Sequence, residues 1–499
     1  MAFARVCSRT LAGVEALQVQ VEVHMTNGIP QFILVGLPDT EVRESRERVR
    51  AAIVNSGFRF PVQRITVNLA PADLPKQSGS FDLPIALGIL AASGQLVESE
   101  LSELEFVGEL ALSGELRAIR GVLPIVLAAE RSGHGVVFPA ENACEAAFSG
   151  LSRLFPARHL RQVCSHLARE ERLSSLSTCH ESRDPIHPDM KDVFGQHVAR
   201  RVMEVAAAGC HHLLLVGTPG TGKSMLARCF PGICPPMTHQ EAMESAVIHS
   251  MSPGGSQQWG SRPYRAPHHS LTVAAMVGGG RKSMPGEVSL AHAGILHLDE
   301  MGEFSTATLE ALREPMETGR ISLSREARKI TYPARFQLVG TMNPCPCGYL
   351  GHVSARCHCS PEQVARYARK VSGPLLDRVD LRVEVPMPDE DDWERISSRS
   401  ESSQDIRQRV GQAVLRQLGR QGQPNGHLEG SVLQHHAPLG STEKTFLMQA
   451  MKRFHLSIRA LHRTWRVAMT IADLDGEERV RLPALGEALR YRGIWPDVD

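Results

Sequence analysis

The stretch that most constrains this chain is residues 211–230, which read HHLLLVGTPGTGKSMLARCF. Residues 213–216 are an apolar run of strand length, and a helical pattern begins close behind them. Between the two stands an eight-residue loop that fits the pattern GxxxxGK[ST]. Its members are Gly217, Thr218, Pro219, Gly220, Thr221, Gly222, Lys223 and Ser224. A strand, this loop and a helix in sequence predict a phosphate-binding loop, because a plain glycine-rich turn needs neither neighbour.

The residue types of this loop match the chemistry of a nucleoside triphosphate. Glycines let the backbone approach closely, and N–H groups at the start of the following helix point at phosphate oxygens. We expect Lys223 to reach the β- and γ-phosphates and the Ser224 hydroxyl to bind Mg²⁺. The sequence therefore predicts ATP and Mg²⁺ as cofactors.

The composition is that of a soluble protein with several domains. Of 499 residues, 42% are hydrophobic and 22% charged, which suits roughly two to four domains. A net charge of +1 excludes a globally basic nucleic-acid coat but not a local basic surface. The sequence shows no signal peptide and no membrane-spanning run. Eleven cysteines without a disulfide pattern indicate a reducing compartment, so a cytoplasmic protein with no membrane partner is expected.

The first third of the chain predicts an α/β unit with mixed strand directions. Apolar and alternating runs predict strands at 18–25, 31–38, 64–71 and 135–139, with a hairpin around Ser113 and Gly114. Helices are predicted at 40–57, 81–94, 122–132 and 141–150, the first of them capped by Asp39 or Thr40.

Two runs in this third, NLAPADLPKQSGSFDLPIAL and GELALSGELRAIRGVLPIVLAAERSGHGVVFP, resemble the Lon-protease-like, ribosomal-S5-domain-2-like fold. In that family a serine before the buried helix attacks, and a lysine at the start of a later helix is its base. Ser80 falls at the serine position, but the lysine position falls on the apolar residues 122–125. A Ser–Lys pair needs a basic amine within reach, so an inactive domain is expected over 1–168, followed by a linker over 169–190. Asp82 is interpreted as a helix cap.

From residue 192 onwards, the order of motifs is that of an AAA+ ATPase. DVFGQ (192–196) resembles the box on the adenine side, and GILHLDE (294–300) is an apolar strand that ends in two acids. By that resemblance Asp299 holds Mg²⁺ through water, and Glu300 polarises the attacking water. His297, inside the same strand, is interpreted as a packed neutral histidine.

Two further motifs complete the expected catalytic set. The buried strand FQLVGTMNP ends at Asn343, the sensor-1 position, where an amide orients the lytic water. The motif SGPLLDR puts Arg378 at the arginine-finger position, which reaches a neighbouring subunit's γ-phosphate and is worth about 10³–10⁵ in rate. A surface salt bridge of Arg378 with Asp377 or Asp380 is the competing interpretation.

Several motifs along the chain together resemble one family. RAPHHS (265–270), VGGG (277–280), PGEVSLAHAG (285–294), NPCPCGY (343–349) and SGPLLDR (372–378) together resemble the ComM/YifB family. Its members are magnesium-chelatase-like AAA+ proteins with an N-terminal Lon-like domain, and the resemblance covers nearly the whole chain. It implies an AAA+ α/β domain of the helix-2-insert clade over 191–386 and a helical lid over 387–499, whose helices are expected over 441–492. In the lid, Arg459 is expected on the sensor-2 helix, facing the phosphates.

The resemblance also implies a function. A hexameric ring, and therefore a homo-oligomer, would hydrolyse ATP at its subunit interfaces and act as a DNA motor. The expected activity is branch migration, a helicase reaction that extends heteroduplex while incoming single-stranded DNA is integrated during natural transformation. Single-stranded and branched DNA are the expected substrates, and recombination proteins are further partners. The alternatives are a chelatase-type motor subunit that remodels a protein partner and a scaffold that uses ATP only to assemble.

Positive charge collects where this clade has inserted hairpins. Residues 263–288 lie where the insertion into helix 2 is expected, and residues 319–335 read as two alternating strands before sensor 1. The candidate DNA contacts are Arg265, Arg281, Lys282, Arg325, Arg328 and Lys329. Such cations suit phosphate contacts that do not depend on sequence, and solvated surface charge is the alternative.

Four cysteines stand on one short stretch, PCPCGYLGHVSARCHCS. They are Cys345, Cys347, Cys357 and Cys359. Two pairs of thiolates suit tetrahedral Zn²⁺, although CxC is tighter than the usual CxxC spacing. His352 and His358 are substitute ligands, and four reduced cysteines on a loop are the alternative. A metal between Asn343 and Arg378 is expected to shape the subunit interface rather than to do chemistry.

Overall fold

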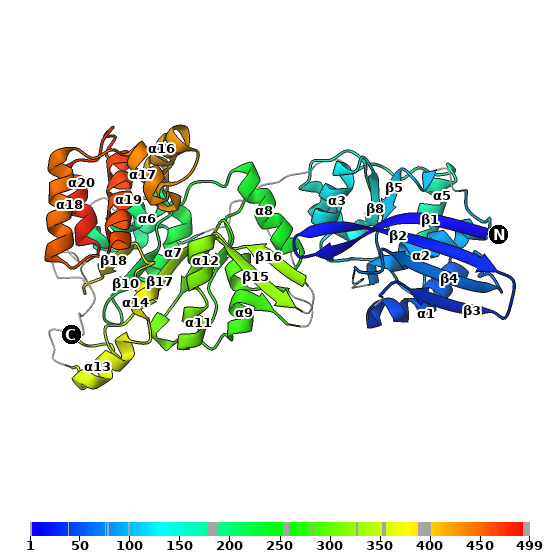
Figure 1. Cartoon of the computed structure of the whole chain (residues 1–499), viewed down its shortest axis with the longest axis horizontal. Coiled ribbons are helices and arrows are strands. Elements are labelled where there is room, and N and C mark those ends of the chain that lie inside the picture. Colours follow the sequence, from blue (N-terminus) through cyan, green and yellow to red (C-terminus); the bar gives the residue numbers. More distant parts are fainter. Residues whose placement is uncertain are drawn as a thin grey trace. The chain divides into compact units, whose positions relative to one another are not determined.

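The computed structural model describes residues 2–37, 39–74, 76, 79–97, 100–176, 187–252, 259–280, 284–325, 328–351, 356–387 and 401–492. The chain divides into two compact units. The first comprises Met1–Arg183, Met243–Trp259 and Ser324–Tyr332, and the second comprises Asp184–Ala242, Gly260–Leu323 and Pro333–Asp499. Both units mix helices and strands (Figure 1). No helix among the described residues combines the length and the apolar content that a membrane crossing needs.

A seven-stranded sheet organises the first unit, in the order β3-β4-β2-β1-β5-β8-β9. Its longest strands, β1 (Ala2–Ala12) and β2 (Glu15–Thr26), form an antiparallel hairpin, and β2 also pairs antiparallel with β4 (Arg64–Ala70). The parallel pairings bring in β3 (Gln31–Val35), β5 (Leu104–Phe106), β8 (Gly135–Pro139) and β9 (Leu154–Ala157). The mixed strand directions are therefore confirmed, whereas β1 was not predicted.

The predicted helices and turn of this unit also form. The helices are α1 (Thr40–Asn55), α2 (Asp82–Ala92), α3 (Val122–Arg131) and α4 (Ala143–Ala147). Asp39 caps α1 by accepting a hydrogen bond from the Val42 N–H at 2.9 Å. A turn at Ser113 and Gly114 joins the short strands β6 (Glu109–Leu110) and β7 (Leu116–Arg117). An α-helix that was not predicted, α5 (Leu160–Leu167), follows β9.

The interpretation of Asp82 as a helix cap is wrong. Its side chain is fully buried and makes no capping bond in α2. Instead, Arg48 of α1 donates two hydrogen bonds to its carboxylate, at 2.7 and 3.2 Å, and the Leu110 N–H donates a third at 3.2 Å. Burial raises the pKa of Asp82 to about 6, although Arg48 pulls it down. The carboxylate therefore ties α1 and β6 to the buried helix, because only such partners offset its desolvation.

A five-stranded parallel sheet organises the second unit, in the order β11-β14-β17-β10-β18. The strands are β11 (Tyr264–Arg265), β14 (Ile295–Leu298), β17 (Gln337–Met342), β10 (Leu213–Val216) and β18 (Leu381–Glu384). Neighbours in the sheet are far apart in sequence, so residues that follow different strands meet at one carboxyl edge. That edge carries the phosphate loop after β10, the two acids after β14 and Asn343 after β17.

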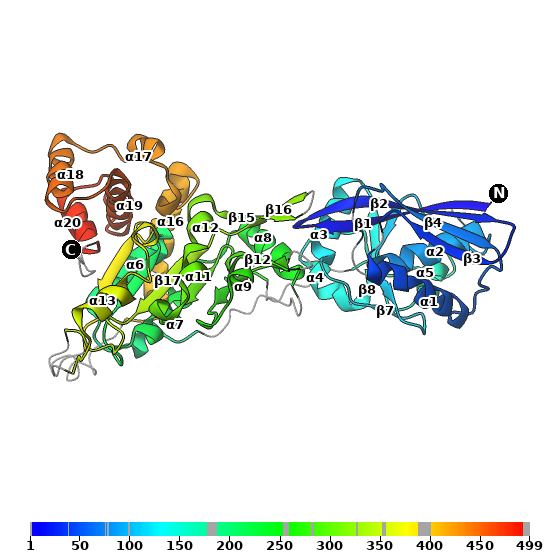
Figure 2. The ribbon, with the colours of Figure 1, turned by 60° about the horizontal axis from the view of Figure 1, so that its bottom comes forward.

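Helices cover both faces of this sheet and give it two apolar cores. One core joins α6 (His197–Gly209) and α7 (Lys223–Ile233) to the C-terminal helices, and the other lies beneath α11 (Thr306–Glu310) and α12 (Arg313–Thr318). The C-terminal helices are α16 (Ser403–Gln421), α17 (Gly430–His436), α18 (Ser441–Arg453), α19 (Ile458–Leu474) and α20 (Leu482–Arg490). They lie together in Figures 1 and 2 and confirm the helices expected over 441–492, whereas α16 falls in a segment that the sequence pattern left open.

Both expected hairpins are found in part. The predicted strand pair before sensor 1 is β15 (Arg320–Arg325) and β16 (Arg328–Pro333). In the region of the expected insertion, β12 (Gly278–Gly279) pairs antiparallel with β13 (Met284–Pro285) after the short helix α9 (Val273–Val277). Assignment to the helix-2-insert clade and to the Lon-like fold stays a prediction.

Candidate nucleotide site and arginine-lined cavity

The phosphate loop leaves the end of β10 and enters α7 at Lys223. Gly222 has a φ of 90°, a left-handed conformation that side chains rarely adopt. At the other end of the loop, a Cβ on Gly217 would lie 2.4 Å from the Val385 carbonyl oxygen, so no larger residue fits there. These two glycines therefore allow the tight path that turns the backbone N–H groups towards a bound anion.

Lys223 is folded back across its own loop. Its ammonium donates hydrogen bonds to the carbonyl oxygens of Gly217 at 2.7 Å and Thr218 at 2.8 Å. Burial lowers the pKa of Lys223 to about 8, while the charges of Asp299 and Glu300 oppose this shift. The ammonium group is thus held at the loop by carbonyl oxygens, and the nearby acids only partly offset the effect of burial on its pKa. Phosphate oxygens at this position would favour the protonated amine.

Asp299 is the centre of the hydrogen-bond network beside the loop. Its Oδ1 accepts hydrogen bonds from the Ser224 hydroxyl at 2.9 Å and the Thr341 hydroxyl at 2.5 Å. Burial raises the pKa of Asp299, but these two donors outweigh that effect and bring it below its ordinary value. Asp299 is therefore ionised and shares its oxygen with Ser224, and such a hydroxyl–carboxylate pair suits Mg²⁺. Thr341 was not predicted, although it stands only two residues before Asn343.

Glu300 has a strained backbone at the end of the acidic strand. Its φ is 52°, which is uncommon for a residue with a side chain. The Glu300 N–H donates a hydrogen bond to the Thr341 hydroxyl at 3.1 Å, so Thr341 holds both acids at once. A strained backbone that is fixed by its neighbours is typical of functional positions.

These side chains surround one cavity of about 410 Å³. It is lined by Pro219, Gly220, Gly222, Lys223, Ser224, Met225, Asp299, Glu300, Thr341, Met342 and Asn343. The structure thus brings together the predicted lysine, serine, two acids and asparagine. Gln196, from the expected adenine-side box, donates hydrogen bonds to the carbonyl oxygens of Pro386 at 2.7 Å and Thr221 at 3.3 Å, which joins that box to the loop.

The interpretation of His297 as a packed neutral residue is confirmed. Its side chain is buried in β14, and its Nδ1 lies 2.6 Å from the Tyr264 hydroxyl. Burial lowers the pKa of His297 to about 4, so the ring is neutral near pH 7.

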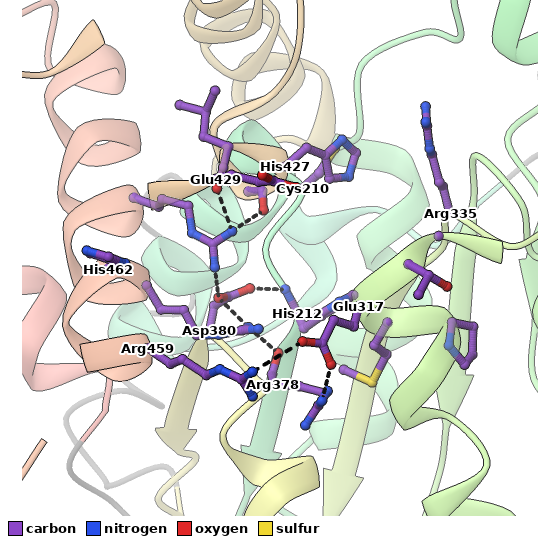
Figure 3. A pocket seen from close by; sticks show the side chains of 18 of the residues that line it. Cys210, His212, Glu317, Arg335, Arg378, Asp380, His427, Glu429, Arg459 and His462 are labelled. Atoms are coloured by element: carbon purple, nitrogen blue, oxygen red, sulfur yellow. Dashed lines mark hydrogen bonds and ion pairs between the residues drawn. The ribbon is translucent and has the colours of Figure 1, made fainter. Parts of the chain in front are cut away.

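Arg378 and Arg459 lie at a different cavity of about 570 Å³ and do not line the first one (Figure 3). Arg378 is buried; its guanidinium donates to the Pro374 carbonyl oxygen at 2.8 Å and pairs with the Glu317 carboxylate. Arg459 is exposed and lies 3.6 Å from the same carboxylate. Arg459 is therefore not among the residues that line the cavity of the phosphate loop, and its role as the sensor-2 arginine stays a prediction. The acidic partner of Arg378 is Glu317, not Asp377 or Asp380.

Two arginines of helix α19 contact the segment that carries Arg378. Arg463 donates hydrogen bonds to the Arg378 carbonyl oxygen at 2.6 Å and to Asp380 at 2.9 Å, and Arg466 lies 3.7 Å from the same carboxylate. Asp380 also accepts the His212 N–H at 3.1 Å, at the start of β10. Burial raises the pKa of Asp380, but the two arginines and His211 outweigh it and bring it well below its ordinary value. Asp380 and Arg463 were not predicted as site residues; the sequence signal for Asp380 is an acid two residues after Arg378.

The four clustered cysteines converge as a metal site requires. Their sulfur atoms all lie within 4.8 Å of one another, and three of the separations are 3.4, 3.6 and 3.8 Å. A tetrahedral zinc with Zn–S bonds of about 2.3 Å sets sulfurs roughly 3.8 Å apart, whereas a disulfide needs about 2.05 Å. The donor set therefore fits Zn²⁺. Of the two substitute ligands, His352 lies outside the described residues and His358 is not part of the group.

The structure describes only part of the candidate DNA surface. Arg265 donates two hydrogen bonds to Glu287, at 2.7 and 2.8 Å, so its charge is already balanced. Lys329 is exposed on β16. Arg281 and Lys282 lie outside the described residues, as do the side chains of Arg325 and Arg328.

Family models match along most of this chain. Magnesium chelatase, subunit ChlI, matches residues 189–393, which carry the cavity of the phosphate loop. Subunit ChlI of Mg-chelatase matches residues 21–142, and the C-terminal region of subunit ChlI matches residues 400–492.

Curated relatives match over nearly the full length. The chain is 46% identical to an uncharacterized protein YifB of Salmonella typhimurium, over 99% of this chain and 98% of that protein. It is 44% identical to the competence protein ComM of Haemophilus influenzae, again over 99% and 98% of the two chains. A magnesium-chelatase 67 kDa subunit of Heliobacterium mobile is 24% identical over 39% of this chain and 34% of its own length.

Proposed function

Since the chain belongs to the ComM/YifB family of magnesium-chelatase-like proteins, we propose that it is a Mg²⁺-dependent AAA+ ATPase working as a DNA motor. The observation that carries the ATPase assignment is the 410 Å³ cavity in which Lys223, Asp299 and Glu300 meet. A lysine, an ionised aspartate and a second acid around a phosphate loop are the groups that phosphoryl transfer to water requires.

Each residue of this cavity has a separate task in hydrolysis. When ATP binds, Lys223 exchanges its bonds to loop carbonyls for bonds to the β- and γ-phosphates. Ser224 and Asp299 hold Mg²⁺, which neutralises charge on the phosphates. Asn343 orients the attacking water, and the Glu300 carboxylate accepts its proton. Through its hydroxyl, Thr341 hydrogen-bonds the Asp299 carboxylate and the Glu300 N–H and so fixes the positions of both acids.

The remaining positive charge comes from a second subunit. Arg378 and Arg459 line the 570 Å³ cavity and cannot serve the phosphates of their own chain in this arrangement. In a ring, which we propose to be hexameric, each would approach the γ-phosphate bound by a neighbour, with Arg378 as the arginine finger. Glu317 holds both until that phosphate replaces it.

DNA is the proposed substrate of the motor. The name of the ComM relative supports a role in competence, and the exposed Lys329 on the β15–β16 hairpin is a suitable phosphate contact. We infer branch migration during the integration of incoming single-stranded DNA as the activity. A chelatase-type motor subunit that remodels a protein is the second candidate, because the matching family models describe magnesium chelatase subunits.

DNA-stimulated ATP hydrolysis distinguishes these functions. Turnover of the full chain is measured alone and with single-stranded, duplex and four-way branched DNA, next to Glu300→Gln as the inactive control. A DNA motor gains activity with DNA and moves the branch point. A chelatase-type motor hydrolyses ATP without a response to any DNA, and a scaffold binds ATP without sustained turnover.

We further propose that Cys345, Cys347, Cys357 and Cys359 bind one structural zinc per chain. Their separations fit a tetrahedral ion, and thiolates are the ligands that zinc prefers in closed sites. Elemental analysis of protein purified without added metal tests the assignment. Less than about half an equivalent, with four free thiols, would show that these cysteines are simply reduced.

The N-terminal part, about residues 1–168, is proposed to be a Lon-like domain without peptidase activity. The region where a lysine would be expected, residues 122–125, opens α3 and is buried and apolar. Incubation with casein tests this, because cleavage that is lost in Ser80→Ala would establish a peptidase.

A further inference from the structure

The first pair of clustered cysteines belongs to a tight turn directly after Asn343. The Gly348 N–H donates a hydrogen bond to the Cys345 carbonyl oxygen at 2.9 Å, which closes the turn Cys345–Pro346–Cys347–Gly348. Proline favours the second position of such a turn. Cys345 is fully buried and Cys347 is half-buried. Two of the four metal ligands thus define the shape of a turn that ends in Gly348.

Gly348 lies directly against the phosphate loop. A Cβ at this position would be 2.6 Å from Cγ and 2.7 Å from Cδ of Pro219, and 3.8 Å from Cγ of Asn343. Real Cβ atoms do not approach other atoms within 3.0 Å, so only glycine fits. The backbone of the cysteine turn therefore packs on the tip of the phosphate loop, next to the asparagine expected to orient water.

The second pair of cysteines leads into a helix that contacts the segment after Glu300. Cys359 is followed at once by Ser360, which caps α13 (Pro361–Ala368). Tyr367 of this helix fills the space beside Gly302, where a Cβ would lie 2.4 Å from its ring. The helix thus packs against the segment that follows Glu300.

We propose that a zinc ion bound by the four cysteines braces the nucleotide site: it ties the turn at Gly348, which supports the phosphate loop, to α13, which supports the segment after Glu300. The proposal rests on the proposed ATPase function and deepens it. The stretch from Cys345 to Cys359 has few apolar side chains, so a metal is the available means of holding it in one shape. Without the metal, the phosphate loop loses its support at Pro219 and ATP binds more weakly.

Two glycines of the same stretch provide a matched test. Gly348 and Gly351 both have left-handed φ values, 84° and 79°, so alanine strains the backbone similarly at each. A Cβ at Gly348 meets Pro219, whereas no atom of the described residues lies within 4 Å of a Cβ at Gly351. Binding of the non-hydrolysable analogue AMP-PNP with Mg²⁺ is measured by calorimetry on the full chain, with zinc content measured on the same samples. We expect Gly348→Ala to keep its zinc and to bind about tenfold more weakly, and Gly351→Ala to stay within about twofold of the wild type.

The outcomes separate this proposal from the ATPase assignment. Wild-type protein that fails to bind AMP-PNP contradicts the proposed function itself. If the wild type and Gly348→Ala both bind AMP-PNP tightly, the proposal that the cysteine turn supports the phosphate loop is wrong, but the ATPase assignment stands. The same holds if Gly348→Ala and Gly351→Ala weaken AMP-PNP binding equally. Removal of zinc by a thiol-directed chelator, followed by transfer to Mg²⁺ buffer, should weaken AMP-PNP binding reversibly. Full affinity in folded, zinc-free protein contradicts the proposal, and if that form unfolds, the pair of glycine variants decides.

Discussion

Two cavities of the second unit, the one at the phosphate loop and the one that contains Arg378, differ in the charged groups that line them. The 410 Å³ cavity has two acids and one lysine around a phosphate loop, and among the described residues no arginine lines it. The 570 Å³ cavity has five arginines, Arg335, Arg378, Arg459, Arg463 and Arg466 (Figure 3). Of these, Arg463 and Arg466 share the buried Asp380, while Arg378 and Arg459 share the exposed Glu317.

Because their charged groups differ in this way, neither cavity alone contains all the groups that phosphoryl transfer requires. The first holds the groups that we propose to bind Mg²⁺ and activate water but, among the described residues, lacks further positive charge for the transition state. The second has that charge without a phosphate loop. The two would be complementary across a subunit interface, and the following predictions test each half of this comparison.

Among the changes within the nucleotide cavity, loss of the Glu300 carboxylate should have the largest effect on turnover. Glu300→Gln removes the proton acceptor but leaves the phosphate loop intact, so kcat should fall by roughly 10²–10⁴ while AMP-PNP affinity stays within twofold. Steady-state ATPase assays and calorimetry measure the two quantities. Glu303→Gln, three residues further on, is the control and should keep wild-type kcat. Near-normal turnover in Glu300→Gln would remove Glu300 from the role of general base.

Replacement of Thr341 tests whether one hydroxyl positions both acids. Thr341→Val keeps the shape but removes the bonds to Asp299 and to the Glu300 N–H, so kcat should fall about tenfold. The Mg²⁺ concentration that gives half-maximal kcat should rise, because Asp299 loses a hydrogen-bond donor that favours its ionised form. Thr308→Val removes a buried hydroxyl outside the cavity and is the control for stability. An unchanged Mg²⁺ dependence would mean that Thr341 only packs.

The pKa of Lys223 predicts a pH dependence of nucleotide binding. Burial lowers this pKa to about 8 in the free protein, and bound phosphates favour the protonated amine. Affinity for AMP-PNP should therefore be highest below pH 8 and fall by up to about tenfold per pH unit above it. Lys223→Arg should bind more weakly but without this slope, because arginine stays protonated. A flat profile for the wild type contradicts the assignment.

The smallest expected effect concerns Glu317, which is half exposed. Glu317→Gln removes the carboxylate that Arg378 and Arg459 share. The γ-phosphate bound by a neighbouring subunit then no longer competes with this carboxylate for the two arginines. The subunit concentration that gives half-maximal ATPase activity should fall by about two- to threefold. Glu314→Gln, on the same helix, should leave it unchanged. A loss of activity comparable to that of Arg378→Ala would show instead that Glu317 positions the finger.

Most residues of the 410 Å³ nucleotide cavity could be predicted from the sequence, because they belong to short motifs. The phosphate loop, Asp299, Glu300 and Asn343 each follow a buried apolar run, and parallel strands bring such ends to one edge. Thr341 was missed because it is one more polar residue inside a strand, and its partners are more than 40 residues away.

The arrangement of the arginines in the 570 Å³ cavity depends on packing between segments far apart in the sequence, so it could not be predicted. The position of Arg459 is set by how α19 packs on the sheet through Arg463 and Asp380, which no spacing reveals. Strand β1 was missed for a related reason. Its buried positions include Ser8, Arg9 and Thr10, which break the apolar alternation. The charge of Arg9 is paired with Glu105, at 2.6 Å on another strand, and its guanidinium also donates to the Ala16 carbonyl oxygen and the Ser132 hydroxyl.

Mixing two inactive variants tests most directly whether the active site is shared between subunits. Lys223→Ala should bind ATP poorly, and Arg378→Ala should lose about 10³-fold or more in turnover, so neither is active alone. In mixed rings some interfaces pair an intact phosphate loop with an intact arginine, and these should restore a measurable fraction of wild-type activity. Restored turnover that rises and falls with the mixing ratio is the predicted result. No restoration, in rings shown to contain both variants, would contradict a site made from the two cavities.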